Sequence, residues 1–113
     1  MAYATAAKTD ADSVIPEEYG GMWFLKGPLD SDAVGLTVLE LEPDAKGKEH
    51  DESETGQEEI YYVVEGEIDV ELDDGTERLG PEEAIRLDPD ETRQLFNRGD
   101  EPATLVLAGG PLG

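Results

Sequence analysis

The stretch E-E-I-Y-Y-V-V-E-G-E-I-D-V-E-L-D-D-G-T-E-R-L, residues 58–79, decides the fold. Residues 59–64 within it are rich in β-branched and aromatic side chains, which favour strands. In residues 67–73 apolar and acidic side chains alternate, so one face is apolar and the other carries carboxylates, as in a half-buried strand. Asp74-Gly75 then predicts a two-residue hairpin turn, because glycine accepts the positive φ that such a turn requires. The stretch therefore predicts antiparallel β-structure.

Short apolar runs separated by turn residues continue on both sides of this stretch. Glycine, proline and aspartate punctuate the chain, and no segment shows the period of about 3.6 residues that marks an amphipathic helix. Eight or nine short strands are typical of a sandwich or barrel, so the predicted fold class is all-β. Besides the strands and hairpin above, we expect strands at 22–25, 35–42, 76–79, 84–87, 93–96 and 103–108, and an arm or edge segment at 1–20.

The composition excludes several classes of function. A chain of 113 residues is the size of one domain, and its 29 Asp and Glu against 8 Lys and Arg give a formal net charge of −21. Such a charge opposes binding to nucleic-acid phosphates or to an anionic membrane surface. Cysteine is absent, which excludes disulfides, thiolate metal sites and cysteine nucleophiles. No apolar run approaches the ~18 residues of a membrane span and no signal peptide is recognisable, so we expect a cytoplasmic protein.

The acidity has two interpretations. High net charge with low hydrophobicity is typical of disordered chains. Here, however, the carboxylates are interleaved with apolar residues rather than gathered in a tail, as residues 67–73 illustrate. We therefore favour a folded protein whose solvent face is saturated with carboxylates, similar to the surfaces of proteins from extreme halophiles. On that interpretation the acidity reports a salt-rich habitat and carries little information about function.

Two stretches resemble the signature motifs of the cupin family. The first is G-K-E-H-D-E-S-E-T-G-Q-E-E-I-Y-Y-V-V-E-G-E, residues 47–67, in which six residues separate Glu59 from Gly66. The second is G-P-E-E-A-I-R-L-D-P-D-E-T-R-Q-L-F-N, residues 80–97, and a hairpin joins the two stretches. The resemblance covers residues 33–110.

This resemblance implies a cupin-type double-stranded β-helix, a jelly-roll barrel of two antiparallel sheets. The single domain would then consist of an N-terminal arm with edge strands at 1–32 and the barrel itself at 33–113. The resemblance also implies a homodimer, because members of the family often pair through an outer strand.

The cupin motif usually supplies three histidines and one glutamate to a divalent metal inside the barrel, and this sequence departs from it. Its one histidine is His50, while Glu52 occupies the second position in the most direct alignment, or Glu54 if the longer loop is counted differently. Arg93 stands at the third position, and Glu59 is the motif carboxylate. One imidazole with two carboxylates suits Fe or Mn, with Zn or Ni as further candidates, but a guanidinium brings a permanent positive charge to the metal position.

We therefore favour a metal-free pocket, in which Arg93 pairs with Glu59 and could also reach Glu52. Alternation places Glu59 on the same face as Tyr61, toward the barrel interior. Other interpretations stay open: His50 as a surface-loop residue, and Arg93 as an exterior residue paired with surface carboxylates. Asn97 is expected to cap a turn. The aromatic residues either line a pocket or fill the core; they are Trp23, Phe24, Tyr61 and Phe96.

The sequence leaves three functions open. The first is a small-molecule-binding cupin with a degenerate metal site, in which Arg93, Glu59 and Tyr61 contact the ligand and Arg93 suits an anionic group. The second is a metal-dependent dioxygenase or isomerase using His50, Glu59 and either Glu52 or Glu54. The third is a structural or interaction module whose pocket has no ligand. The sequence does not decide whether the protein is an enzyme.

Overall fold

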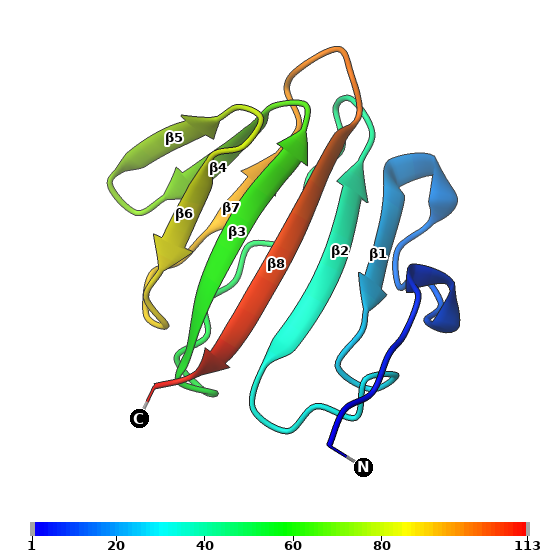
Figure 1. Ribbon diagram of the computed structural model, residues 1–113. Helices are drawn as coiled ribbons and strands as arrows, with labels where there is room; N and C mark the ends of the chain where they lie inside the picture. Colours follow the sequence, from blue (N-terminus) through cyan, green and yellow to red (C-terminus); the bar gives the residue numbers. More distant parts are fainter. Residues whose placement is uncertain (1, 113) are drawn as a thin grey trace.

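Eight β-strands form two antiparallel sheets in the computed structural model, which describes residues 2–112 (Figure 1). Met1 and Gly113, the ends of the predicted arm and barrel, lie outside the described residues. The strands are β1 (Gly20–Phe24), β2 (Gly35–Leu41), β3 (Gln57–Glu65), β4 (Ile68–Leu72), β5 (Gly75–Leu79), β6 (Ala84–Leu87), β7 (Gln94–Phe96) and β8 (Ala103–Pro111), and two short 3₁₀ turns precede them, η1 (Lys8–Asp10) and η2 (Glu17–Tyr19).

The two sheets confirm the predicted all-β jelly roll. The larger sheet has the strand order β1-β2-β8-β3-β6, and the smaller has β5-β4-β7. Alternation along β3 and β8 sends Tyr61, Val63, Leu105 and Leu107 inward, where they meet Val70 from the smaller sheet in one core. Among residues 2–112 no helix is long and apolar enough to cross a membrane.

Most strand boundaries differ from the sequence-based expectation by one to three residues, and two of these differences have a clear physical cause. Gly20 and Gly21 were expected to precede the first strand, but they belong to β1, where a Cβ on Gly20 would lie 1.9 Å from the carbonyl oxygen of Glu40. Only glycine permits so close a pairing. The β4–β5 hairpin is confirmed, but its loop lies one residue earlier than predicted, because Leu72 pairs with Gly75. The loop residues, Asp73 and Asp74, have no positive φ and so need no glycine.

The connection from β2 to β3 determines where the site lies. Instead of crossing the surface as a free loop, it runs antiparallel to β7 and its flanks: Gly47 N–H donates to Leu95 O at 2.8 Å, and Asn97 N–H donates to Ala45 O at 2.9 Å. His50 and Arg93 form an isolated bridge at the end of this pairing. The connection thereby becomes a wall facing the inner side of the larger sheet.

Asn97 fixes the end of this wall, as its predicted turn-capping role requires. Its side-chain oxygen accepts a hydrogen bond from Gly99 N–H at 3.0 Å, which caps the turn. Its side-chain nitrogen donates to Leu41 O and Glu101 O, both at 2.9 Å, and the residue is only 1% exposed. One buried amide therefore joins β2 to the loop between β7 and β8.

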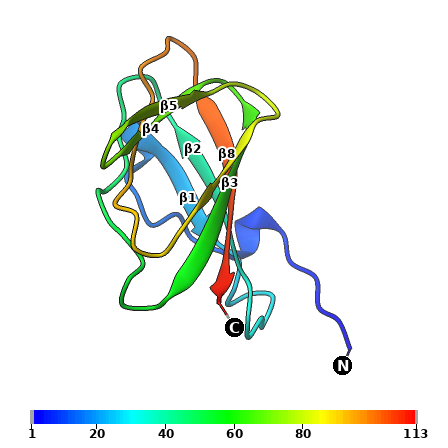
Figure 2. The same cartoon turned by 90° about the vertical axis from the view of Figure 1, so that its left-hand side faces the viewer.

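The first part of the N-terminal arm, with η1, lies on the outer side of the larger sheet (Figure 2), whereas Ile15 packs against the core. Lys8 sits 4.1 Å from the ring centroid of Trp23 and 3.1 Å from a carboxylate oxygen of Glu40. On the same outer face, register aligns Trp23, Val38, Val106 and Tyr62 in one row across β1, β2, β8 and β3. The homodimer, the salt-adapted surface and the division after residue 32 stay predictions.

Asp69 differs from the expectation that all carboxylates of residues 67–73 lie on a solvated face. It points away from the core, but Arg78 and Arg98 cover it, leaving it 5% exposed. Arg78 Nε donates to it at 2.8 Å and Arg98 Nη1 at 3.0 Å, and Arg98 also lies over the ring of Phe96. The hydrogen bond from Arg78 has the largest effect, and together with that from Arg98 it holds the pKa of the Asp69 carboxyl below its usual value of 3.8.

Asp69→Asn is expected to lower the free energy of unfolding at neutral pH by about 1–2 kcal/mol, because two charge-assisted contacts weaken while both arginines stay partly solvated. The lowered pKa makes this stabilisation complete above the unfolded pKa of about 3.9, and it disappears as the pH falls through the folded pKa. Urea unfolding of wild type and variant between pH 7 and about pH 3 tests this. Glu71→Gln, on the same strand but more exposed, should change stability by less than ~1 kcal/mol. A wild-type advantage over Asp69→Asn that grows on acidification would contradict the assignment.

Candidate ligand cavity and polar cluster

A cavity of about 920 Å³ lies between the inner face of β1 and β2 and the connection that leads to β3. Met22, Phe24 and Leu39 contribute an apolar wall, and Phe24 remains 48% exposed there. The smaller sheet and the connection together do not cover the inner face of β1 and β2 completely. A ligand-sized space with an apolar side is typical of small-molecule sites, which usually measure about 300–1,000 Å³.

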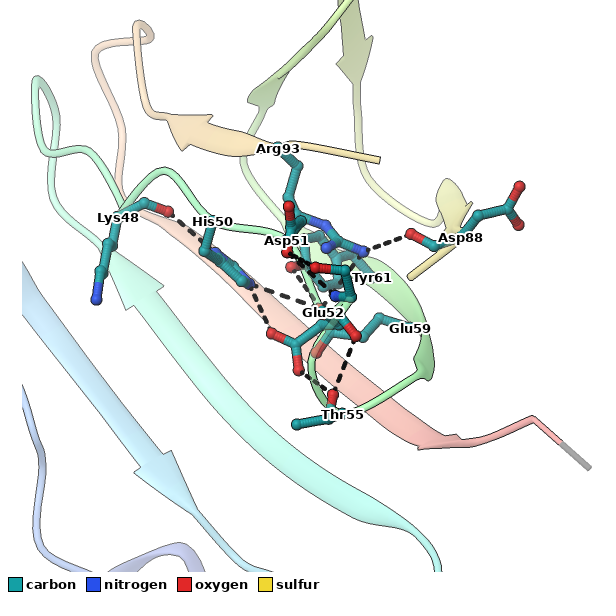
Figure 3. A network of polar contacts seen from close by, with 10 residues as sticks. Lys48, His50, Asp51, Glu52, Thr55, Glu59, Tyr61, Asp88 and Arg93 are labelled. Atoms are coloured by element: carbon teal, nitrogen blue, oxygen red, sulfur yellow. Dashed lines mark hydrogen bonds and ion pairs between the residues drawn. The ribbon is translucent and has the colours of Figure 1, made fainter. Parts of the chain in front are cut away.

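Five side chains form a polar cluster at one end of the cavity: His50, Glu52, Glu59, Tyr61 and Arg93 (Figure 3). Its centre is the Oε1 atom of Glu59. Tyr61 donates its hydroxyl hydrogen to this oxygen at 3.1 Å. His50 Nε2 and Arg93 Nη2 each lie 3.8 Å from the same atom. Glu59 thus points into the barrel beside Tyr61, as alternation along β3 predicts.

Contacts of both its backbone and its ring fix the orientation of His50. Its backbone exchanges two hydrogen bonds with Arg93, at 3.0 and 2.9 Å. Its Nδ1 lies 3.1 Å from the carbonyl oxygen of Lys48, an acceptor that selects the tautomer with hydrogen on Nδ1. Nε2 then faces Glu52, whose Oε2 is 3.5 Å away. His50 therefore lies in a loop but within the cluster, and its role as a ligand stays a prediction.

Glu52, and not Glu54, lies in the cluster. The backbone N–H of Glu52 donates to Pro89 O at 2.7 Å, and the Thr55 hydroxyl donates to Glu52 Oε1 at 3.1 Å. Glu54 is exposed and lies outside the group of ligand atoms formed by His50, Glu52 and Glu59. Of the two alignments that the sequence left open, the direct one matches the structure.

The side chain of Arg93 is buried behind the cluster, where residue 93 forms its bridge to the β2–β3 connection. Its side chain is 0% exposed, so the interpretation of an exterior arginine is wrong. Nη2 donates to Asp88 O at 3.2 Å, whereas Nε and Nη1 are buried without a hydrogen-bond partner. Its distance of 3.8 Å from Glu59 is an ion pair rather than a hydrogen bond, and within residues 2–112 it makes no ion pair with Glu52. Burying a guanidinium with two unpaired donors is costly. The ion pair with Glu59 offsets part of this cost.

Tyr61 serves the cluster as a hydrogen-bond donor. Burial, and next the negative charge of Glu59, raise the pKa of its phenol far above the usual value of 10.0. The hydroxyl therefore stays protonated across the physiological range and can only donate to the carboxylate.

The ligand atoms of His50, Glu52 and Glu59 all lie within 4.8 Å of one another. One imidazole nitrogen and two carboxylate oxygens form a set that Fe, Mn or Zn accepts, and the hydrogen bond from Nδ1 to a backbone carbonyl is the usual support for a ligating histidine. These residues fit a divalent metal. The guanidinium of Arg93 weakens such a site, because it lies 3.8 Å from one of the same oxygens.

The sequence missed part of the site. Three lysines also line the cavity: Lys26, Lys46 and Lys48. Lys46 and Lys48 flank Gly47, where the first motif begins, and this position was the available signal in the sequence. Of the aromatic candidates, Phe24 and Tyr61 line the cavity.

An antiparallel jelly roll with an internal cavity and a His/Glu/Glu cluster at the end of it defines a class of small ligand- or metal-binding barrels. The chain belongs to the cupin family: the family model described as Cupin domain matches residues 37–109. No curated protein matches the chain.

Solved structures of the same fold include a cupin protein from Bacteroides fragilis, with a TM-score of 0.81 and 18% identity over 100% of this chain and 87% of that one. The polyketide cyclase RemF from Streptomyces resistomycificus has a TM-score of 0.75 and 25% identity over 94% and 78% of the two chains. A sugar phosphate isomerase of the cupin superfamily from Silicibacter pomeroyi has a TM-score of 0.71 and 24% identity over 90% and 69%.

Proposed function

We propose that this cupin binds a small organic molecule in the cavity between the inner face of β1 and β2 and the connection to β3. The observation that carries the proposal is the cavity itself: about 920 Å³, with Met22, Phe24 and Leu39 on one side and the polar cluster at one end. Such a site buries an apolar body while a few polar groups orient it. Exposed apolar side chains inside a cavity, such as Phe24, also gain free energy when a ligand removes them from water.

The fold does not decide the chemistry, since one fold supports many functions. The similar structures illustrate this, because a polyketide cyclase and a sugar phosphate isomerase occur among them. The chemistry therefore depends on the side chains of the cavity, and those at its polar end are more suited to orienting a ligand than to supplying a nucleophile.

Thr37→Trp is expected to abolish ligand binding without unfolding the protein. Thr37 lies on β2 and lines the cavity, so an indole there fills space that a ligand would occupy. Val38→Trp is the matched control, because the adjacent residue faces the opposite side of the same strand, beside Trp23. Isothermal titration with phenyl-substituted short-chain compounds should show at least about tenfold weaker binding for Thr37→Trp only, since the added side chain competes for the same volume. Equal binding by both variants would refute the cavity as the site.

A second candidate function is binding of one divalent cation by His50, Glu52 and Glu59. The observation that favours it is the hydrogen bond between His50 Nδ1 and the Lys48 carbonyl, which leaves Nε2 free to ligate beside the two carboxylates. A bound metal would supply a Lewis acid that polarises an oxygen of the organic ligand. The protein would then be a metal-dependent enzyme, as the second hypothesis from the sequence has it.

A further inference from the structure

The cavity gathers half of the chain's cationic side chains. Four of the eight Lys and Arg residues line it, whereas only three of the 29 Asp and Glu residues do. The cations are Lys26, Lys46, Lys48 and Arg93, and the carboxylates are Asp51, Glu52 and Glu59. The lining is therefore slightly cationic in a chain whose net charge is −21.

The three cavity lysines have no internal partner. Within residues 2–112 the ion pairs of at most 4.0 Å include one lysine, Lys8, which contacts Glu40 at 3.1 Å on the outer side of the sheet. Lys26, Lys46 and Lys48 make no such pair, although acidic residues outnumber basic ones by more than three to one. Unpaired ammonium groups that line a cavity attract anions.

The arrangement separates a charged region from an apolar one. Lys46 and Lys48 belong to the connection, and Lys48 extends away from Glu52 and Glu59 (Figure 3). The apolar wall with Met22 and Phe24 lies on β1. An anion would be repelled by the two cluster carboxylates and attracted by the lysines, so its charged group would stay on the lysine side while its apolar part contacts the wall.

We propose that the ligand of this cavity is an amphipathic organic carboxylate, with its carboxylate held by Lys46 and Lys48 and its apolar body on the β1–β2 wall. This inference rests on the proposed ligand-binding function and names the ligand class. In a chain of net charge −21, and beside the cluster carboxylates, a singly charged carboxylate is repelled less than a doubly charged phosphate.

The test compares three probes with the same apolar body: 4-phenylbutyrate, 4-phenyl-1-butanol and 4-phenylbutylammonium. Isothermal titration is carried out on the folded chain, verified by circular dichroism, with EDTA present so that no metal mediates binding. At about 0.15 M KCl, where charges act over about 8 Å, the carboxylate should bind about tenfold tighter than the alcohol, and the ammonium compound should bind weakest.

Lys46→Gln and Lys48→Gln should each weaken carboxylate binding up to about fivefold and leave alcohol binding unchanged, as expected for partly exposed ion pairs. Lys8→Gln is the control, because it makes the same change of charge outside the cavity, and it should alter neither. If the alcohol binds as tightly as the carboxylate, or if Lys8→Gln acts like the cavity variants, the ligand class is wrong while the cavity remains a binding site. If none of the three probes binds, the proposed function fails and this inference fails with it.

Discussion

Replacement of Arg93 with methionine is expected to tighten the binding of Zn²⁺ or Mn²⁺ to the polar cluster by at least about tenfold. The guanidinium lies 3.8 Å from Glu59 Oε1, an atom that also belongs to the His50–Glu52–Glu59 set. Two unit charges about 4 Å apart interact by about 4 kcal/mol at an effective dielectric constant of about 20, so even a part of this repulsion exceeds a tenfold change in affinity. Methionine retains most of the buried volume, but the substitution removes one partner of a buried pair and leaves Glu59 without it, so circular dichroism must first show that Arg93→Met is folded.

The affinity is measured by isothermal titration at about 1 M KCl. At this salt concentration the charges of the acidic surface act over only about 3 Å, so non-specific cation binding is suppressed. Glu59→Gln in the Arg93→Met background should remove the site. Glu58→Gln is its matched control, because Glu58 is the preceding residue of β3 and pairs with Arg86 at 3.7 Å instead of joining the cluster. Unchanged metal affinity in Arg93→Met would show that the guanidinium does not oppose a cation, and the idea that Arg93 replaces the metal would be lost.

Asn97→Ala is expected to lower the free energy of unfolding by about 2–4 kcal/mol. The substitution removes three hydrogen bonds, of which the one to Leu41 O is fully buried and those to Glu101 O and from Gly99 N–H are partly buried. An unsatisfied buried group costs about 1–3 kcal/mol before local relaxation, and a partly buried one costs less. Urea unfolding at constant salt measures the change, and the slope with urea should stay constant if only stability is affected.

Gln94→Ala serves as the control for Asn97→Ala. Gln94 lies on β7, which ends one residue before Asn97, and donates one side-chain hydrogen bond to Gly47 O at 2.9 Å, so its loss should cost about 0.5–1.5 kcal/mol. Equal destabilisation by the two variants would contradict the central position given to Asn97.

The local patterns of the sequence predicted the parts of the fold that depend on alternation. Residues 67–73 formed β4, and the period of two along β3 correctly placed Glu59 beside Tyr61 inside the barrel. The hairpin turn lies at Asp73 and Asp74 because Leu72 pairs with Gly75 across the two strands. The dipeptide Asp74-Gly75 alone does not contain this register. Asp69 was expected on a solvated face because alternation along one strand does not show its cover, which comes from Arg78 on the paired strand β5 and from Arg98 in the loop after β7.

The site was only partly predictable, since it depends on the path of the β2–β3 connection. The choice between Glu52 and Glu54 is decided by the hydrogen bond from Glu52 N–H to Pro89 O, a contact between loops. The burial of Arg93 follows from its backbone bridge to His50, and the gathering of Lys46 and Lys48 at the cavity follows from the same pairing. None of these contacts has a periodic signature in the sequence.

The most direct test of the ligand-binding cavity is a ¹H–¹⁵N correlation spectrum of the wild-type protein, recorded while 4-phenylbutyrate or 4-phenyl-1-butanol is added. If either compound occupies the cavity, the shifted backbone amides should belong to the lining residues of three segments, at positions 22, 24 and 26, 35–37 and 39, and 46–48 and 50–52. Amides of β4 and β5, on the far sheet, should stay in place. Shifts confined to the outer row of Trp23, Val38, Val106 and Tyr62, or no shifts with either compound, would contradict binding in the cavity.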